Sequence, residues 1–350
     1  EEDGTYSERT KFGMISVIIH EVGHNYFPMI VNSDERQWGW MDEGLDTFVQ
    51  YLTEQDFGIS YPESIGNLTT YPSRRGDPKQ IVPYMAGNQN FISPIMSNPE
   101  NVYQLGPNAY AKPATALNIL RETIMGRESF DHAFKTYAKR WMFKHPTPED
   151  FFRSMEDASA TDLDWFWRGW FYSTDVVDIG VKNVKRYYFS DTPDQKTMEK
   201  LEAYGYDLEN LPDMLYKINE DSESFDPKFD DFSARSSKVL NKYLSDEGLD
   251  IKEIPKYFYE IEFEKPGGLV MPLIVEYSYA DGSVERIKYP VQLWRKNDNT
   301  VKKVITSNKK LIGVTVDPDL ETADVNLDNN NWPKQEIPSD FEKYKEKLKG

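Results

Sequence analysis

The sequence contains no cysteine, only four histidines and no long apolar segment. Without cysteine, its 350 residues can form neither disulfides nor thiolate metal sites. Its apolar runs are far shorter than the roughly 18 residues of a membrane-spanning helix, and its first residues show no signal-peptide pattern. These absences exclude a cysteine-based zinc site and a disulfide-stapled small fold, and they predict no membrane span.

Positive charge is also scarce. Lys and Arg number 41 against 59 Asp and Glu, which gives a formal net charge of -18. Because phosphate groups repel such a chain, neither nucleic acid nor anionic lipid is expected as a partner. Aromatic residues are abundant, with 22 Tyr, 19 Phe and 8 Trp, and they predict a substantial core despite a mean hydropathy of -0.69.

Two of the histidines lie four residues apart with a glutamate between them. On a helix, His20 and His24 project from one face and can bind one metal ion, while Glu21 lies about 100° round the helix. After eighteen intervening residues, Glu43 can supply a third ligand from a second helix and leave a fourth position for water. The pattern predicts a metal site; the alternative is a chance pairing of two buried histidines.

With these residues in view, the chain resembles the gluzincin metallopeptidases, the family of aminopeptidase N and leukotriene hydrolase. The resemblance rests on H-E-x-x-H, the eighteen-residue gap to Glu43, and the segment Trp38-Gly-Trp-Met-Asp-Glu43-Gly, which is similar to the family's W-x-x-E-G helix start. It implies one zinc ion per chain, held by His20, His24 and Glu43. Thermolysin-like enzymes share these ligands with a slightly longer gap, so the spacing favours the aminopeptidase branch.

The resemblance and the local chemistry suggest roles for further residues. Glu21 is expected to act as the general base that takes a proton from water and passes it to the leaving amine. In the family, a tyrosine at the head of a Y-x-K-G helix stabilises the oxyanion, and by resemblance that residue is Tyr110, although Pro113 stands where Gly is more common. Asp46 is interpreted either as an acid that orients a histidine or as a solvated helix residue, and it is left outside the predicted site.

Residues 1–184 are predicted to be mainly helical. Thr5-Tyr-Ser-Glu8 predicts a capping box, and a second helix is expected from about Asp42 to Phe57, with Gly58 as its stop. Thr161 is expected to cap a later helix. The apolar stripe expected to bury one side of the first helix comprises Phe12, Ile15, Ile19, Val22 and Tyr26.

From Tyr257 the spacing of apolar residues changes to every second position, which predicts several short strands. The predicted fold is α+β and multidomain: a mainly α-helical, thermolysin-like catalytic domain followed by an antiparallel β-sandwich. Its expected parts are residues 1–184, the zinc metallopeptidase catalytic domain without its N-terminal portion; 185–255, a linker or helical insertion; 256–333, the sandwich; and 334–350, a charged tail.

The predicted function is hydrolysis of N-terminal peptide bonds, with a peptide as the substrate. The family's G-x-M-E-N segment, which reads the substrate's amino group, does not occur in this sequence. Because residue 1 is Glu rather than Met, an upstream N-terminal domain of the same protein is expected to carry it. Export from a bacterial cell, to the periplasm or the medium, is one option for the compartment, which is otherwise unknown.

Other functions are compatible with the same residues. An endopeptidase or a family-type epoxide hydrolase would use the same metal chemistry. A non-catalytic or fragmentary module could keep the zinc site and bind peptides or a partner protein without turning them over. The intact Glu21 beside intact ligands argues against a degenerate site.

Overall fold

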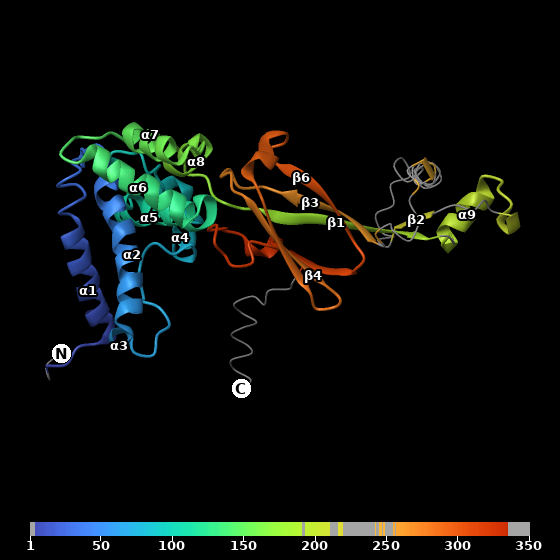
Figure 1. The fold of residues 1–350 in the computed structure, drawn as a ribbon, viewed down its shortest axis with the longest axis horizontal. Helices are drawn as coiled ribbons and strands as arrows, with labels where there is room; N and C mark the ends of the chain where they lie inside the picture. The colour runs from blue at the N-terminus through green and yellow to red at the C-terminus, as the bar shows by residue number, and fades with distance from the viewer. Residues whose placement is uncertain are drawn as a thin grey trace. The chain divides into compact units, whose positions relative to one another are not determined.

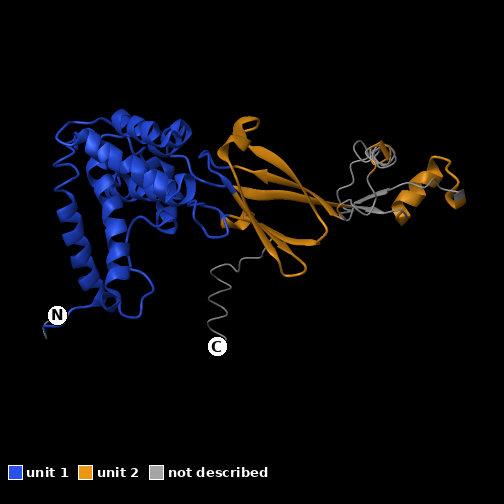
Figure 2. Cartoon of the chain, in the orientation of Figure 1, with its two compact units in different colours: residues 1–178, 266–273, 317–326 blue, residues 179–265, 274–316, 327–350 orange. Residues whose placement is uncertain are grey.

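The computed structural model describes residues 4–190, 193–210, 216–219, 242, 245–246, 248, 255 and 257–334. The chain forms two compact units (Figure 2). Unit 1 contains residues 1–178, 266–273 and 317–326, and unit 2 contains residues 179–265, 274–316 and 327–350. Unit 1 is helical and unit 2 is built on antiparallel sheets, so the predicted α+β multidomain class is confirmed.

The helical unit contains α-helices interrupted by short π-helical and 3-10 turns (Figure 1). None of the helices in the described ranges is both long enough and apolar enough to cross a membrane. The α-helices are α1 (Glu8–Gly23), α2 (Leu45–Ser60), α3 (Pro62–Ile65), α4 (Pro78–Met85), α5 (Lys112–Ile119), α6 (Arg127–Trp141), α7 (Pro148–Ser159) and α8 (Asp164–Tyr172). The π-helical turns are η1 (Trp40–Gly44), η4 (Gly106–Ala111) and η5 (Leu120–Met125), and the 3-10 turns are η2 (Gln89–Phe91) and η3 (Pro99–Asn101).

The core of the helical unit is rich in aromatic side chains. The ring of Trp40, at the start of η1, lies 4.8 Å from Phe171 and 5.6 Å from Phe151, measured between ring centroids. Phe152 stacks on Trp167 at 4.7 Å. These distances are typical of edge-to-face and stacked aromatic pairs, which stabilise a core beyond the area they bury. The aromatic residues of α8 therefore hold the start of η1 in place.

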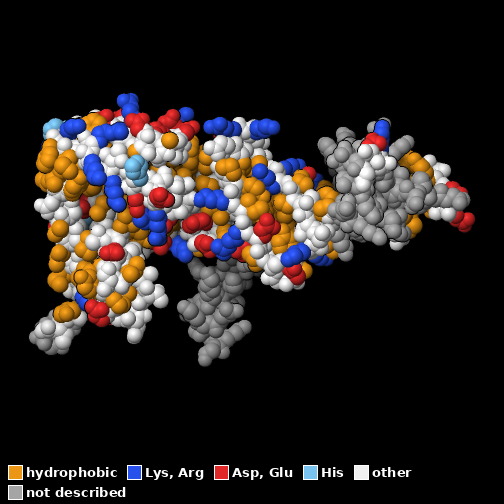
Figure 3. Space-filling view, viewed as in Figure 1, with side chains coloured by type: hydrophobic (Ala, Val, Ile, Leu, Met, Phe, Trp, Pro, Cys, Tyr) orange, Lys and Arg blue, Asp and Glu red, His pale blue; other side chains and the backbone are white. Residues whose placement is uncertain are grey.

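Helix α1 begins at a different cap from the predicted one. The side chain of Ser7, and not that of Thr5, accepts a hydrogen bond from the backbone N–H of Thr10, at 3.2 Å. Phe12 is buried as expected, but Val22 is 63% exposed. The reason is that α1 packs mainly against α2, which covers only one of its sides. Hydrophobic side chains on the rest of α1 reach the surface (Figure 3).

Two other predicted helix boundaries are wrong. Gly58 lies inside α2, which continues to Ser60; a Cβ at Gly58 would come within 3.1 Å of the backbone nitrogen of Tyr71, so close packing accounts for this glycine. Helix α8 is preceded by Leu163, and the hydroxyl of Thr161 donates to a backbone carbonyl instead of capping the helix. In both cases tertiary packing overrides the local signal.

Unit 2 contains two four-stranded sheets, with strand orders β2-β1-β3-β6 and β5-β4-β7-β8. On β3, Tyr259, Ile261 and Phe263 are buried, as the alternation predicts. The hydroxyl of Tyr259 accepts a hydrogen bond from the backbone N–H of Leu311 on β7, at 2.8 Å, and so joins one sheet to the other. The strands are β1 (Gly180–Ser190), β2 (Tyr216–Asn219), β3 (Tyr257–Glu264), β4 (Leu273–Tyr279), β5 (Val284–Tyr289), β6 (Thr300–Ser307), β7 (Leu311–Val316) and β8 (Asn331–Trp332).

The range 185–255, expected to be a linker or helical insertion, contains regular elements. Residues 185–190, expected within a linker, form the second half of β1, which pairs with β3. Helix α9 (Gln195–Ala203) and strand β2 also lie within the range expected to be a linker or insertion. Most of residues 211–256 and almost all of the charged tail expected at 334–350 lie outside the described residues.

Lys112 makes a test of the fold possible, because it is only 1% exposed and its burial lowers the pKa of the ammonium to about 8. The unfolded chain therefore binds more protons than the folded chain between pH 8 and the ordinary value of 10.5. Stability must rise with pH across this window, by about 3 kcal/mol for one such group.

Urea unfolding of wild type and of Lys112→Met is measured at pH 7.5 and at pH 10. We expect the free energy of unfolding of wild type to rise relative to that of Lys112→Met between these two pH values. The exposed Lys139 provides the control, because Lys139→Met should leave the pH dependence unchanged. A difference between wild type and Lys112→Met that stays constant with pH would contradict the burial of a charged lysine.

Candidate metal centre

Helix α1 packs against α2, and η1 leads directly into α2, so the motif residues come to one place. The Nε2 atoms of His20 and His24 lie 3.1 Å apart. Oε2 of Glu43 lies 3.1 Å from Nε2 of His20 and 3.3 Å from Nε2 of His24. We call these three residues the histidine–glutamate cluster. The structure therefore brings together the three predicted ligands, each with one donor atom directed at the same point.

The spacing of the cluster fits zinc. Tetrahedral zinc with bonds of about 2.0–2.1 Å keeps its donor atoms about 3.4 Å apart, close to the separations in the cluster. Two further groups, which bring in Asp46 or Asp42, also have donor atoms within 4.8 Å of one another. However, both aspartates contact Nδ1 of a histidine, on the side of the ring away from Nε2. We therefore take Asp42 and Asp46 as supports for the ligands.

Asp46 lies directly behind His20. Its Oδ2 is 2.7 Å from Nδ1 of His20, while the ring N–H points toward Oε1 of Gln50 at 3.0 Å. The contact with Asp46 is therefore best described as an ion pair and that with Gln50 as the hydrogen bond. Asp46 is 1% exposed, so its interpretation as a solvated helix residue is wrong. A Cβ on Gly23 would lie 1.9 Å from Oδ1 of Asp46, so glycine is required there.

His24 is held in a similar way. Its Nδ1 lies 2.9 Å from the carbonyl oxygen of Phe27 and 3.1 Å from Oδ1 of Asp42. A partner at Nδ1 fixes the tautomer that leaves Nε2 as the electron-pair donor, and it orients the ring. Both imidazoles thus have a carboxylate on one side and the shared Glu43 oxygen on the other.

The cluster attracts cations. The Asp46 carboxylate at Nδ1, followed by the Glu43 carboxylate at Nε2, raises the pKa of His20 to about 10. Burial and the charge of Glu43 raise the pKa of Asp42 to about 7. Burial works against the ionised form of Glu43, but hydrogen bonds from His20 and Tyr110 lower its pKa overall. Protons therefore accumulate where three carboxylates surround two imidazoles, and a metal ion would replace them.

Glu43 and Tyr110 both lie on π-helical turns. The prediction places Glu43 in a regular helix starting near Asp42, but the structure has the π-turn η1 there, followed by α2. Tyr110 lies on η4, and its hydroxyl donates to Oε1 of Glu43 at 2.5 Å. A Cβ on Gly44 would lie 2.8 Å from the carbonyl oxygen of Ala109, so η1 and η4 meet where a side chain is missing. π-turns are frequent at functional sites, and sequence periodicity does not reveal them.

A cavity of about 280 Å³ opens beside the cluster. Glu21 and Tyr110 line it together with His20, so the predicted base and the predicted oxyanion donor share one space with a ligand. Glu21 is exposed and projects from α1 away from Nε2 of the two histidines, since it lies between them in sequence. Arg74, Arg75 and Glu54, which sequence reasoning did not select, also line this cavity.

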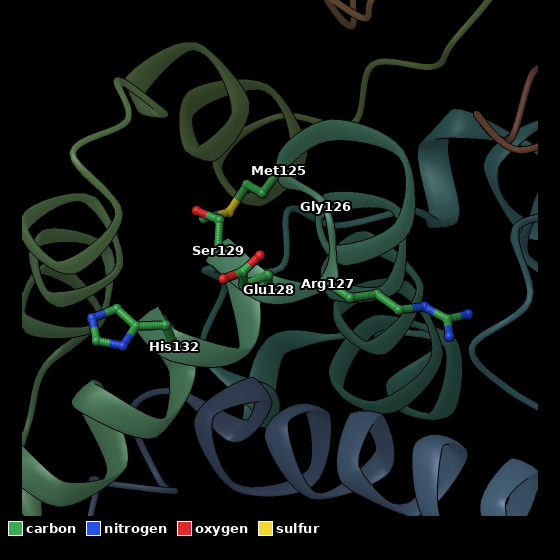
Figure 4. A pocket seen from close by; sticks show the side chains of 6 residues that line it. All are labelled: Met125, Gly126, Arg127, Glu128, Ser129 and His132. Atoms are coloured by element: carbon green, nitrogen blue, oxygen red, sulfur yellow. The ribbon is translucent and has the colours of Figure 1, made fainter.

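A second concavity, of about 560 Å³, lies at the junction of η5 and α6 (Figure 4). Its side chains do not converge: Arg127 and His132 extend in opposite directions. Arg127 is mostly exposed and pairs with Glu122. Despite its larger volume, this surface lacks convergent polar groups, and the cavity beside the cluster is the better candidate site.

The close contact at Gly44 gives a first prediction for this centre. Gly44→Ala should lower the free energy of unfolding by about 1–3 kcal/mol, because the added methyl group overpacks against Ala109 and Pro113. It should also weaken zinc binding by displacing Glu43. Gly106→Ala is the matched control, because an added Cβ there meets no atom within 4 Å. Equal effects of the two substitutions in urea unfolding would show that the contact is unimportant.

The ion pair between Asp46 and His20 gives a second prediction for this centre. Asp46→Asn should weaken zinc binding by about 10- to 100-fold, the usual effect of removing a carboxylate that supports a ligand histidine. Competition with a chromophoric chelator measures the affinity. Asp56→Asn, at an exposed position of the same helix, should bind zinc as wild type does. Unchanged affinity in Asp46→Asn, with the protein folded, would argue against the supporting role.

Comparison with known proteins finds a family that matches the helical part of the chain. Residues 2–170 match the family model of the Peptidase family M1 domain. Glutamyl aminopeptidase from Bos taurus is 27% identical over 220 residues, which cover 59% of this chain and 21% of that protein. Aminopeptidase N from Lactococcus lactis subsp. lactis is 21% identical over 209 residues, 57% of this chain and 24% of that protein.

Among solved structures, that of Legionella pneumophila aminopeptidase A in complex with aspartic acid has 13% identity and a TM-score of 0.44, and the match covers 88% of this chain and 26% of that one. The chain thus spans between 21% and 26% of the length of these three proteins. The matched residues include the whole histidine–glutamate cluster, which agrees with the resemblance seen in the sequence. Through its residues 2–170, the chain is thus similar to peptidase family M1 and to its members aminopeptidase N and glutamyl aminopeptidase.

Proposed function

We propose that this chain carries the catalytic centre of a zinc aminopeptidase, with one zinc ion bound by His20, His24 and Glu43. The observation that carries the proposal is the convergence of three donor atoms, 3.1–3.3 Å apart, beside a cavity lined by Glu21 and Tyr110. The names of the relatives, which are aminopeptidases, support the reaction type. The substrates are peptides with a free amino terminus.

Bound zinc supplies Lewis acidity, which makes water ionise near neutral pH and polarises a carbonyl group. Glu21 then has a defined task. Its carboxylate lies off the ligand face of α1 and lines the cavity, so it can accept a proton from the attacking water and give it to the leaving amine. A carboxylate in this place acts on the reaction without holding the metal.

Tyr110 supplies a donor to the developing oxyanion. Burial, and then its hydrogen bond to Glu43, raise the pKa of the Tyr110 hydroxyl, so the group keeps its proton at neutral pH and can donate it in a hydrogen bond. Loss of such a donor slows related reactions by about a hundredfold or more. Arg75 stacks on the ring of Tyr110 and helps to hold it at the cavity wall.

The family's G-x-M-E-N segment, which reads the substrate's amino group, does not occur in the sequence. An endopeptidase would share the same metal centre but would also cleave peptides with a blocked amino terminus. The two activities are therefore separated by substrate choice.

Glu21→Gln tests the proposal. The variant should bind one zinc ion per chain, as wild type does, but should lose hydrolysis of aminoacyl arylamides by a factor of about 100 or more, since a general base contributes 10²–10⁴-fold. Zinc content is measured by metal analysis and turnover by arylamine release, with N-blocked peptides beside the free ones. Glu8→Gln, in the first turn of the same helix, is the matched control. Absence of zinc from wild type would refute the proposal.

A further inference from the structure

Arg75 is a cation in the wall of the candidate active-site cavity. Its guanidinium carbon lies 4.5 Å from the centre of the Tyr110 ring, and its side chain lines the cavity together with Glu21. The residue is half-buried. Among the described residues, no carboxylate forms an ion pair with Arg75 and no group accepts a hydrogen bond from it, so the cation–π contact is its main interaction with the protein.

The backbone on both sides of Arg75 is anchored. The hydroxyl of Ser73 donates to Glu54 and accepts from Gln55 on α2. The carbonyl oxygen of Gly76 accepts a buried hydrogen bond from Asn118, at 3.0 Å. Gly76 has a φ of +104°, and a Cβ there would overlap the ring of Tyr51, so only glycine fits this bend. The position of Arg75 is therefore fixed by its neighbours before any ligand arrives.

The nearby carboxylates are already engaged. Glu54 accepts hydrogen bonds from Ser73 and Gln50, and Glu43 accepts them from His20 and Tyr110. Burial lowers the pKa of Arg75 and the like charge of Arg74 adds to this effect, while Tyr110 and the charges of Glu43 and Glu54 oppose it. The guanidinium of Arg75 has therefore lost part of its hydration, but no carboxylate of the described residues replaces the water by binding both of its N–H edges. A carboxylate brought in by a ligand would supply that partner.

We propose that Arg75 binds a carboxylate of the substrate and makes the protein prefer peptides with an anionic group next to the cleaved bond. This inference rests on the proposed peptidase function and deepens it. Arg75 is then a specificity-determining residue. Its contact with the Tyr110 ring determines how far the guanidinium lies from the scissile carbonyl. Arg74, which lines the same cavity but is exposed, adds positive charge to it.

The distance from Arg75 to the ring of Tyr110 limits which carboxylate can bind. The hydroxyl of Tyr110 marks the place of the scissile carbonyl, so Arg75 can reach only groups within about one residue of it, given a residue length of about 3.5 Å. Three sources meet this limit: an acidic side chain before the cleaved bond, an acidic side chain after it, and the terminal carboxylate of a dipeptide.

Three matched pairs of substrates separate these sources. Glutamyl and glutaminyl arylamides test the side chain before the bond, and the amides of Ala-Glu and Ala-Gln test the side chain after it. Ala-Ala and Ala-Ala-amide test the terminal carboxylate. For zinc-loaded wild type, we expect the anionic member of one pair to be favoured by about 10- to 100-fold in kcat/KM, the size of a hydrogen bond to a charged group.

Arg75→Gln should abolish this preference, mainly by raising KM for the anionic substrate, and Arg75→Lys should keep part of it. Arg36→Gln, at an exposed position outside the cavity, should retain it fully. A role of Arg75 limited to positioning Tyr110 predicts another pattern: kcat would fall equally for both members of every pair. That pattern would overturn the inference, and so would a preference that survives in Arg75→Gln.

Binding measurements separate failure of this inference from failure of the proposed function. Calorimetry with Glu21→Gln compares the two members of each pair without cleavage, and the double variant Glu21→Gln/Arg75→Gln gives the contribution of Arg75. If wild type cleaves no substrate, the peptidase proposal fails, but tighter binding of an anionic member that depends on Arg75 still supports the carboxylate site. Equal binding of both members in all three pairs would refute it.

Discussion

The close approach of η1 and η4 at Gly44 is the contact on which the candidate centre depends. A residue with a Cβ at this position would meet Pro113 at 2.6 Å and the carbonyl of Ala109 at 2.8 Å. Because the two π-turns touch here, Glu43 and Tyr110 can share a hydrogen bond although 67 positions separate them in sequence. The aromatic core around Trp40 supports this contact from behind. Glu43 and Tyr110 are thus positioned by backbone packing rather than by long side chains.

The residues of the candidate site could be selected from the sequence because their spacing is local. His20 and His24 lie one helical turn apart, and the position of Glu43 follows from a family pattern. Asp46 could not be ranked in the same way, since an acid three residues beyond a ligand is as often solvated as buried. Its burial follows from the absence of a side chain at Gly23, which is a property of two helices together and not of either one.

In the fold, too, the features that depend on local sequence could be predicted, and those that depend on long-range packing could not. Alternating residues predicted the strands from Tyr257 onward, and the buried positions of β3 follow that alternation. The pairing of β1 with β3 was not foreseeable, because about seventy residues separate the strands and their alternation says nothing of the partner. The π-turns are also invisible to periodicity, as each adds one residue to a single turn.

The charge of the chain and the position of Arg75 act over different distances. A net charge of -18 repels anionic peptides at long range, but salt screens exposed charges beyond a Debye length of about 8 Å. Inside the cavity the guanidinium is close to its ligand and partly shielded from water, so its attraction is screened far less. An acidic surface slows the approach of an anionic substrate, whereas the proposed contact with Arg75 acts only on a peptide that has already entered the cavity.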